Sequence, residues 1–101
     1  MFFEWDDAKN NINIQKHGLS FADVRGVFFD PFCLRVLDSR FTDIHDEERW
    51  QALGTVNGVT VILVAYTYRD NDDQEVIRII SARKANKTER RSYEHAKTRG
   101  Y

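Results

Sequence analysis

The segment from Glu48 to Tyr68 reads ERWQALGTVNGVTVILVAYTY and predicts a β-hairpin at the centre of the fold. Two runs rich in β-branched and aromatic residues, 48–56 and 59–68, flank the dipeptide Asn57-Gly58. That dipeptide is typical of a two-residue type I′ turn, because both of its residues tolerate a positive φ. The second run is apolar on both faces, which indicates a central strand.

The turn also predicts which residues of the hairpin lie opposite each other. A two-residue loop would place Arg49 opposite Tyr66 and Trp50 opposite Ala65. Opposed residues share a face, so one face of the pair would be almost wholly apolar, and the other would present Arg49 and Tyr66. We expect the apolar face to receive helices and the second face to stay partly open.

Two short amphipathic helices are predicted before the hairpin. The first is expected over Asp7–His17, with Gly18 as the residue that ends it. Ser20 is a suitable N-cap for the second helix. Asp30-Pro31 ends that helix, because a residue before proline is pushed out of the α region.

The remaining segments complete the predicted fold. They are a strand at Phe32–Leu37, a polar loop at Asp38–Asp46, a charged turn at Arg69–Gln74, a strand at Glu75–Arg83 and a helix that begins with Asn86 and Glu89 and ends near Gly100. This order predicts an α+β fold with two N-terminal helices, a four-stranded, mostly antiparallel sheet and a C-terminal helix. A chain of 101 residues without a break in composition is expected to form a single domain over residues 1–101.

The composition indicates a folded protein, because 42% of the residues are hydrophobic despite 31% charged residues. A location in the cytoplasm is expected from the lack of a leader and of a long apolar stretch. Cys33 is the single cysteine, so it cannot form an internal disulfide and suits a reducing compartment. No secretory leader follows Met1 and no apolar stretch is long enough for a membrane span, so no membrane contact is expected. His17, His45 and His95 lie in separate elements without a cysteine partner, so neither a metal nor another cofactor is expected.

Positive charge is concentrated at the end of the chain. Residues 76–101 hold eight of the fifteen Lys and Arg residues and two acids, so this segment carries about +6 (8 − 2) in a chain of net charge −1. A cationic surface on a nearly neutral protein favours a polyanionic partner. The alternative is a solvated basic helix whose charges are paired elsewhere, and charge alone does not separate the two.

The residue types needed to cleave RNA without a metal are present. Such cleavage requires a base at the 2′-hydroxyl, cations at the phosphate and an acid at the leaving oxygen. Arginine suits the phosphate because its planar fork binds two oxygens. His17 is the strongest candidate for proton transfer, although Lys16 and His17 would also stabilise the end of the first helix. Arg78 and Arg83 are an odd number of residues apart in one predicted strand, so their side chains would project from opposite faces of the sheet. Only one of them is therefore expected on the face of Arg49.

Four segments carry a family resemblance, and they occur in order along most of the chain. They are FEWDDAKNNINIQKHGLSF (Phe3–Phe21), VFFDP (Val27–Pro31), EER (Glu47–Arg49) and RIISARKANKTERRSYE (Arg78–Glu94). Together they resemble BrnT-type toxins, the ribonuclease half of a type II toxin–antitoxin pair. The sequence departs from the family pattern mainly around Arg40–Asp46.

The resemblance implies a RelE-like domain that cleaves RNA by attack of the 2′-hydroxyl, as an endoribonuclease that needs no metal. It also implies neutralisation by an antitoxin with a ribbon-helix-helix DNA-binding part, so that DNA is contacted only through the complex. The residues implied are His17, Arg49, Arg78 and Arg83 as catalytic groups and Lys16, Tyr66, Lys84 and Tyr93 as RNA-binding groups. The alternative is a non-catalytic module that docks an acidic or amphipathic partner on its basic face.

Overall fold

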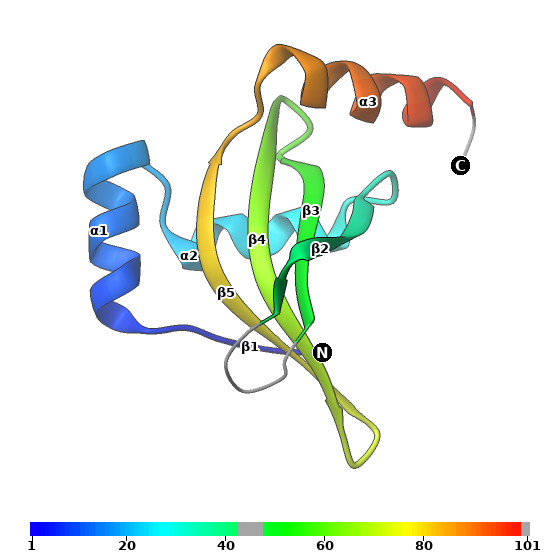
Figure 1. The fold of residues 1–101 in the computed structure, drawn as a ribbon. Coiled ribbons are helices and arrows are strands. Elements are labelled where there is room, and N and C mark those ends of the chain that lie inside the picture. The colour runs from blue at the N-terminus through cyan, green and yellow to red at the C-terminus, as the bar shows by residue number, and fades with distance from the viewer. Residues whose placement is uncertain (43–47, 100–101) are drawn as a thin grey trace.

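A computed structural model describes residues 1–42 and 48–99, with the backbone alone for residues 39–42. The elements are β1 (Phe2–Glu4), α1 (Asp7–His17), α2 (Phe21–Val24), the 3-10 helix η1 (Arg25–Phe29), β2 (Leu34–Thr42), β3 (Glu48–Val56), β4 (Thr60–Asn71), β5 (Gln74–Lys84) and α3 (Lys87–Thr98). The strands form one sheet in the order β1-β5-β4-β3-β2, in which β1 is parallel to β5 and the other pairs are antiparallel (Figure 1). The predicted α+β class is confirmed.

Two strand predictions need correction. The strand β1 was not predicted, because its three residues are too few to show the alternation that identifies a strand. The strand β2 runs to Thr42, where the polar sequence predicted a loop from Asp38. Polar residues are acceptable there because β2 is an edge strand of the sheet. The rest of that predicted loop, residues 43–47, lies outside the described residues.

The central hairpin forms as predicted, but its register is shifted by one residue. Asn57 and Gly58 have φ values of 62° and 72°, as a type I′ turn requires. Val56 nevertheless pairs with Thr60, so Val59 belongs to the loop. The loop therefore has three residues where two were predicted, and every pair along the hairpin changes.

The shift moves Tyr66 to the other face of the sheet. Arg49 lies opposite Thr67, and Trp50 lies opposite Tyr66. Tyr66 is 1% exposed and packs edge-on against Phe28 of η1, with ring centroids 4.9 Å apart. The predicted pairing of Tyr66 with Arg49 on a half-open face is thus wrong.

The sheet separates two apolar clusters. One face packs against α2 and η1, and its cluster includes Phe21, Val24, Val27, Phe28, Ala52, Val64, Tyr66, Ile77 and Ile79. The upper part of the other face packs against α3 through Leu53, Val61, Leu63, Ala85 and Tyr93. In Figure 1, α2 lies behind the sheet and α3 crosses its upper end. Below α3, no helix of the described chain covers this second face.

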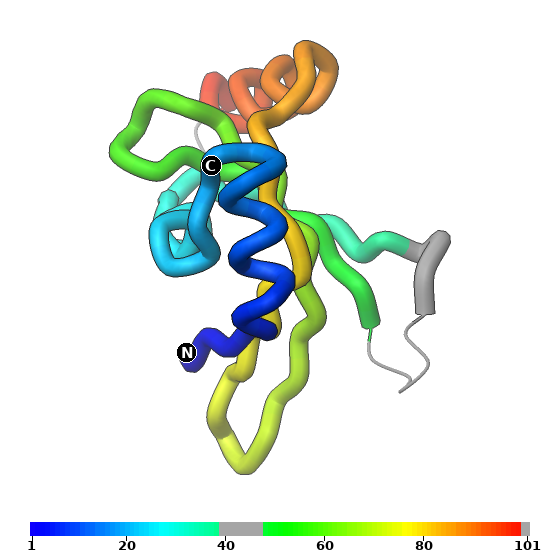
Figure 2. The backbone as a smooth tube through the Cα atoms, turned by 90° about the vertical axis from the view of Figure 1, so that its left-hand side faces the viewer, coloured from blue at the N-terminus to red at the C-terminus, as the bar shows by residue number. Residues whose placement is uncertain are grey.

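The helix α1 lies along the edge of β5 (Figure 2). The strand β1 pairs with β5 only as far as Arg78, so the edge beyond it needs another partner. Asn13, which is 5% exposed, supplies it: its Oδ1 accepts a hydrogen bond from the Ala82 amide at 3.0 Å. Its Nδ2 donates to the carbonyl of Leu19 at 2.9 Å. One amide side chain thus fixes α1 to the sheet and satisfies its edge.

A β-bulge in β5 overturns the prediction that Arg78 and Arg83 project from opposite faces of the sheet. Ser81 pairs with Ala65 and Ile79 pairs with Tyr66, so Ile80 is an extra residue in β5. The extra residue changes the alternation between Arg78 and Arg83. Both arginines therefore belong to the α3 side of the sheet, where opposite sides were predicted.

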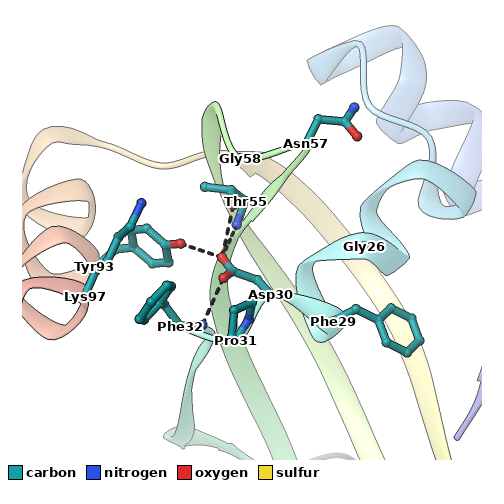
Figure 3. Close-up of a pocket in the computed structure, with 10 residues that line it drawn as sticks. All are labelled: Gly26, Phe29, Asp30, Pro31, Phe32, Thr55, Asn57, Gly58, Tyr93 and Lys97. Atoms are coloured by element: carbon teal, nitrogen blue, oxygen red, sulfur yellow. Dashed lines mark hydrogen bonds between the residues drawn. The ribbon is translucent and has the colours of Figure 1, made fainter. Parts of the chain in front are cut away.

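The carboxylate of Asp30 connects three segments (Figure 3). Its Oδ2 accepts hydrogen bonds from the Thr55 amide at 2.8 Å, the Thr55 hydroxyl at 3.1 Å and the Tyr93 hydroxyl at 2.5 Å. Its Oδ1 accepts a hydrogen bond from the Phe32 amide at 2.9 Å. Burial opposes the ionisation of Asp30, but the hydrogen bonds from Tyr93, Phe32 and Thr55 together lower its pKa. The carboxylate therefore holds the end of η1, β3 and α3 together.

We predict that Tyr93→Phe lowers the free energy of unfolding by about 1–3 kcal/mol, because a buried carboxylate loses a donor. The matched control is Tyr68→Phe, whose hydroxyl makes a longer bond of 3.4 Å to Glu75. Urea unfolding measures both.

The loss of unfolding free energy caused by Tyr93→Phe should be smaller at acidic pH. Asp30 has a lowered pKa, so its stabilisation is present above the ordinary carboxyl pKa and is lost as the pH falls through the lowered one. Equal effects of Tyr93→Phe and Tyr68→Phe at neutral pH would contradict the role given to Asp30.

Candidate functional site

The uncovered part of the sheet carries a row of polar side chains. Arg49 of β3 lies opposite Thr67 of β4, and Thr67 lies opposite Arg78 of β5. Directly opposed residues project from the same face, so the two arginines flank Thr67 on one surface. We call this surface, below α3, the open face. It is formed by Arg49, Gln51, Ala65, Thr67, Arg69, Arg78 and Ser81.

Glu4 brings two guanidinium groups to one oxygen atom. The Glu4 Oε1 lies 2.8 Å from Nη1 of Arg69 and 3.8 Å from Nη1 of Arg78. Glu4 reaches them because β1 places it beside Arg78 in the sheet. The side chains of Arg69 and Arg78 are 40% and 44% exposed, so solvent reaches both. The open face can therefore place two arginines around a single negatively charged oxygen.

The other edge of the open face has a second carboxylate. Asp38 of β2 is 8% exposed and accepts a long hydrogen bond of 3.4 Å from Nε2 of Gln51. Gln51 is two residues from Arg49 in β3 and projects from the same face. Acidic side chains thus border the arginines at both edges of the sheet.

His17 and Lys16 lie in a different place, at the end of α1. They line a shallow pocket together with Lys9, Asn13 and the β5 residues Ile80 and Ser81. Ser81 pairs with Ala65, so it belongs to the open face as well as to this pocket. The His17 pocket therefore adjoins the open face at Ser81, but His17 is not part of the arginine row.

Arg83 is engaged with α3. Its two terminal nitrogens donate to the two carboxylate oxygens of Glu89, at 2.8 and 3.0 Å. Glu89 also closes a capping box with Asn86, at the helix start that was predicted from the sequence. The bidentate bond to Glu89 raises the pKa of Arg83 and lowers that of Glu89. Arg83 thus joins β5 to the start of α3.

The remaining predicted residues lie apart from the arginine row. Tyr66 and Tyr93 are both 1% exposed, and burial raises the pKa of each to about 12. Neither hydroxyl can take up or release a proton near neutral pH. Lys84 is exposed and pairs with Ile62, which faces the α2 side of the sheet. The structure thus brings Arg49 and Arg78 together and separates both from Tyr66, Tyr93 and Lys84.

Sequence reasoning missed two residues of this site. Glu4 belongs to β1, a strand too short to be recognised. Arg69 was assigned to a turn, but β4 continues to Asn71, and the turn is made by Asp72 and Asp73, which both have positive φ. Positive φ at two adjacent residues is typical of a type I′ hairpin, and an Asn71-Asp72-Asp73 sequence would have been the signal for it.

No group of three or more His, Cys, Asp or Glu side chains is placed to hold a metal ion in the described part of the chain. None of the helices described is long and apolar enough to cross a membrane.

Comparison with known proteins identifies relatives of the chain. The family model described as "Ribonuclease toxin, BrnT, of type II toxin-antitoxin system" matches residues 5–89. A crystal structure of the Brucella abortus ribonuclease toxin BrnT is similar, with a TM-score of 0.60 and 29% sequence identity. The match covers 86% of this chain and 100% of the Brucella chain. No curated protein matches the sequence.

We predict that Arg83 is important for stability and that Arg78 is not. Arg83→Ala should lower the free energy of unfolding by about 0.5–1 kcal/mol, because a bidentate but partly exposed ion pair is lost. Arg78→Ala should lower it by less, since its contact with Glu4 is longer. Urea unfolding compares the two variants, and a greater loss for Arg78→Ala would contradict the assignment.

Proposed function

The chain belongs to the BrnT family of ribonuclease toxins of type II toxin–antitoxin systems, and we propose that it cleaves RNA at the open face without a metal ion. The contact of both Arg69 and Arg78 with one oxygen of Glu4 carries this proposal. A phosphate oxygen that replaced the Glu4 carboxylate would meet two guanidinium groups. Two such groups can supply the positive charge that a pentacoordinate phosphate requires.

The arginine row suggests how the substrate is held. Arg49 and Arg78 lie on either side of Thr67, so a bound phosphate would be contacted from both sides. The nucleophile is then the neighbouring 2′-hydroxyl, which attacks the phosphorus while the 5′-oxygen leaves. This reaction needs one group to remove a proton and another to return one.

His17 remains our candidate for one of the proton transfers, and Lys16 for positioning the RNA backbone. Support comes from their pocket, which shares Ser81 with the open face. An RNA strand that passes over Ser81 would reach both regions. Arg83, Tyr66 and Tyr93 are not retained as contacts to RNA, because the first is paired with Glu89 and the other two are buried.

We further propose that a protein antitoxin of the ribbon-helix-helix type neutralises the toxin in the cytoplasm. Type II systems use a protein antitoxin, and the family membership supports that much. An antitoxin that covers the open face would exclude RNA by occupying the same arginines. DNA would then be contacted only by the antitoxin part of the complex.

Replacing the arginines tests the proposal directly. Arg49→Ala and Arg78→Ala should each reduce the rate of RNA cleavage in EDTA by about 10²–10³-fold, because each removes a donor that stabilises the transition state. Arg25→Ala is the matched control, since Arg25 belongs to η1 on the other side of the sheet. Cleavage of a labelled RNA by each purified variant measures the effect.

The same variants separate an enzyme from a non-catalytic binding module. For an enzyme, expression without antitoxin should arrest growth, and Arg78→Ala should relieve the arrest. Wild-type protein that binds its antitoxin but cuts no RNA would favour the module. Cleavage that EDTA abolishes would refute metal independence while leaving the ribonuclease activity intact.

Salt provides an independent test of phosphate contact. The affinity for a non-cleavable RNA should fall linearly on a plot of log K against log salt, with a slope of about −0.7 for each phosphate neutralised in a single strand. Arg78→Ala should make the slope smaller by about one such step, whereas Arg25→Ala should leave it unchanged. A slope near zero for the wild-type protein would contradict binding through the arginines.

A further inference from the structure

A second pocket, mostly aromatic, lies on the face of the sheet opposite to Arg49 and Arg78. Its lining consists of Arg35, Trp50, Tyr66, Tyr68 and Glu75, and its volume is about 160 Å³. Trp50 and Tyr66 are paired across β3 and β4 and project toward the side of η1. The pocket is smaller than sites for drug-sized ligands, which measure about 300–1,000 Å³. It is therefore a site for one ring system or one side chain.

The polar groups of this pocket are of two kinds. Glu75 accepts a hydrogen bond from the Tyr68 hydroxyl at 3.4 Å through Oε1, and its second oxygen makes no contact among those described. The Arg35 guanidinium stacks over the ring of Phe28, 5.2 Å from its centroid, which holds it at the rim. A carboxylate and a guanidinium thus face a common space between aromatic rings.

Trp50 adds a donor that lacks an acceptor. Its Nε1 is buried and has no hydrogen-bond partner in the part of the chain that the structure describes. Buried side-chain donors are nearly always paired, and this unpaired one belongs to a residue that lines the pocket.

We propose that this pocket binds a guanine base of the RNA substrate, an inference that rests on the proposed function. Guanine has two adjacent donors, N1–H and the 2-amino group, which one carboxylate can accept together. It also has two adjacent acceptors, O6 and N7, which suit a guanidinium. Glu75 and Arg35 match these two edges, and Trp50 and Tyr68 offer rings for stacking.

Guanine accounts for more of the lining than other ligands do. Adenine, cytosine and uracil each lack a pair of adjacent donors for the Glu75 carboxylate. A cationic side chain of a partner protein would suit the aromatic rings and Glu75, but Arg35 at the rim would repel it. An anion would suit Arg35 but would be repelled by Glu75. The pocket therefore favours a neutral base with both donors and acceptors.

The position of the pocket indicates which nucleotide it reads. Trp50 and Arg49 are neighbours in β3 but project from opposite faces of the sheet. An RNA strand must therefore pass round an edge of the sheet to reach both sites, so the base in the pocket does not belong to the cleaved nucleotide. The pocket would select where along a strand the toxin cuts.

Binding of short 2′-O-methyl RNAs, which cannot be cleaved, tests the inference. A single guanine in a uridine strand should bind wild-type protein about 5- to 150-fold more tightly than adenine or uracil at that position. Hypoxanthine, which lacks the 2-amino group, should lose most of this preference. Glu75→Gln should remove the preference while keeping the size of the side chain.

The control variant is Asp73→Asn. It removes one negative charge from the same β4–β5 hairpin, but Asp73 does not line the pocket. It should keep the guanine preference unchanged. Circular dichroism of both variants should match the wild type, and the hypoxanthine comparison depends on no protein variant at all.

The outcomes separate this inference from the proposed function. If all RNAs bind alike, or if Glu75→Gln keeps the preference, the guanine pocket is refuted. Weaker binding of every RNA by Arg78→Ala would in that case still support the nuclease. If no RNA binds the wild-type protein, both proposals fail. Weaker antitoxin binding by Glu75→Gln with the RNA preference intact would overturn the pocket assignment in favour of a protein contact.

Discussion

The carboxylate of Asp30 is the interaction on which the arrangement of this fold depends. It accepts hydrogen bonds from β3, from α3 and from the segment that follows η1. Gly54 favours this close approach of the 3-10 helix to β3, since a Cβ at that position would lie 3.0 Å from the side chain and the carbonyl oxygen of Val27. The same carboxylate fixes α3 at the upper end of the sheet through Tyr93. The lower half of that face is therefore left for function.

The two faces of the sheet have different tasks as a consequence. One face is largely filled by aromatic and aliphatic side chains below α2 and η1, and its uncovered lower part forms the aromatic pocket around Trp50. The other face contributes to a smaller core below α3 and then carries the arginines. If RNA contacts both faces, the arginine face would cleave the RNA and the face with the aromatic pocket would select the base. Each surface could then change with little effect on the other.

How well each feature of this fold could be predicted depended on how far apart in the sequence the interacting residues lie. The glycine that ends α1, the start of α3 at Asn86 and the turn at Asn57-Gly58 are local, and the sequence identified each of them. The strand β1, the hairpin register and the bulge at Ile80 depend on pairing between distant segments, and the sequence missed them. For the site, residue types were therefore easier to predict than faces: Arg49 and Arg78 share one face on either side of Thr67, whereas Tyr66 and Tyr93 are core residues.

The bulge has a consequence for how relatives of this protein should be compared. Arg78 and Arg83 are five residues apart, a spacing that divides them between the two faces of a regular strand, and the bulged Ile80 brings them to one side. A homologue that lost the bulge by losing one residue would keep both arginines on that side, whereas one that kept the spacing and lost the bulge would divide them. Percentage identity does not register that difference, so the strand pairing in this short interval is a better guide than residue matches to whether a relative retains the same geometry.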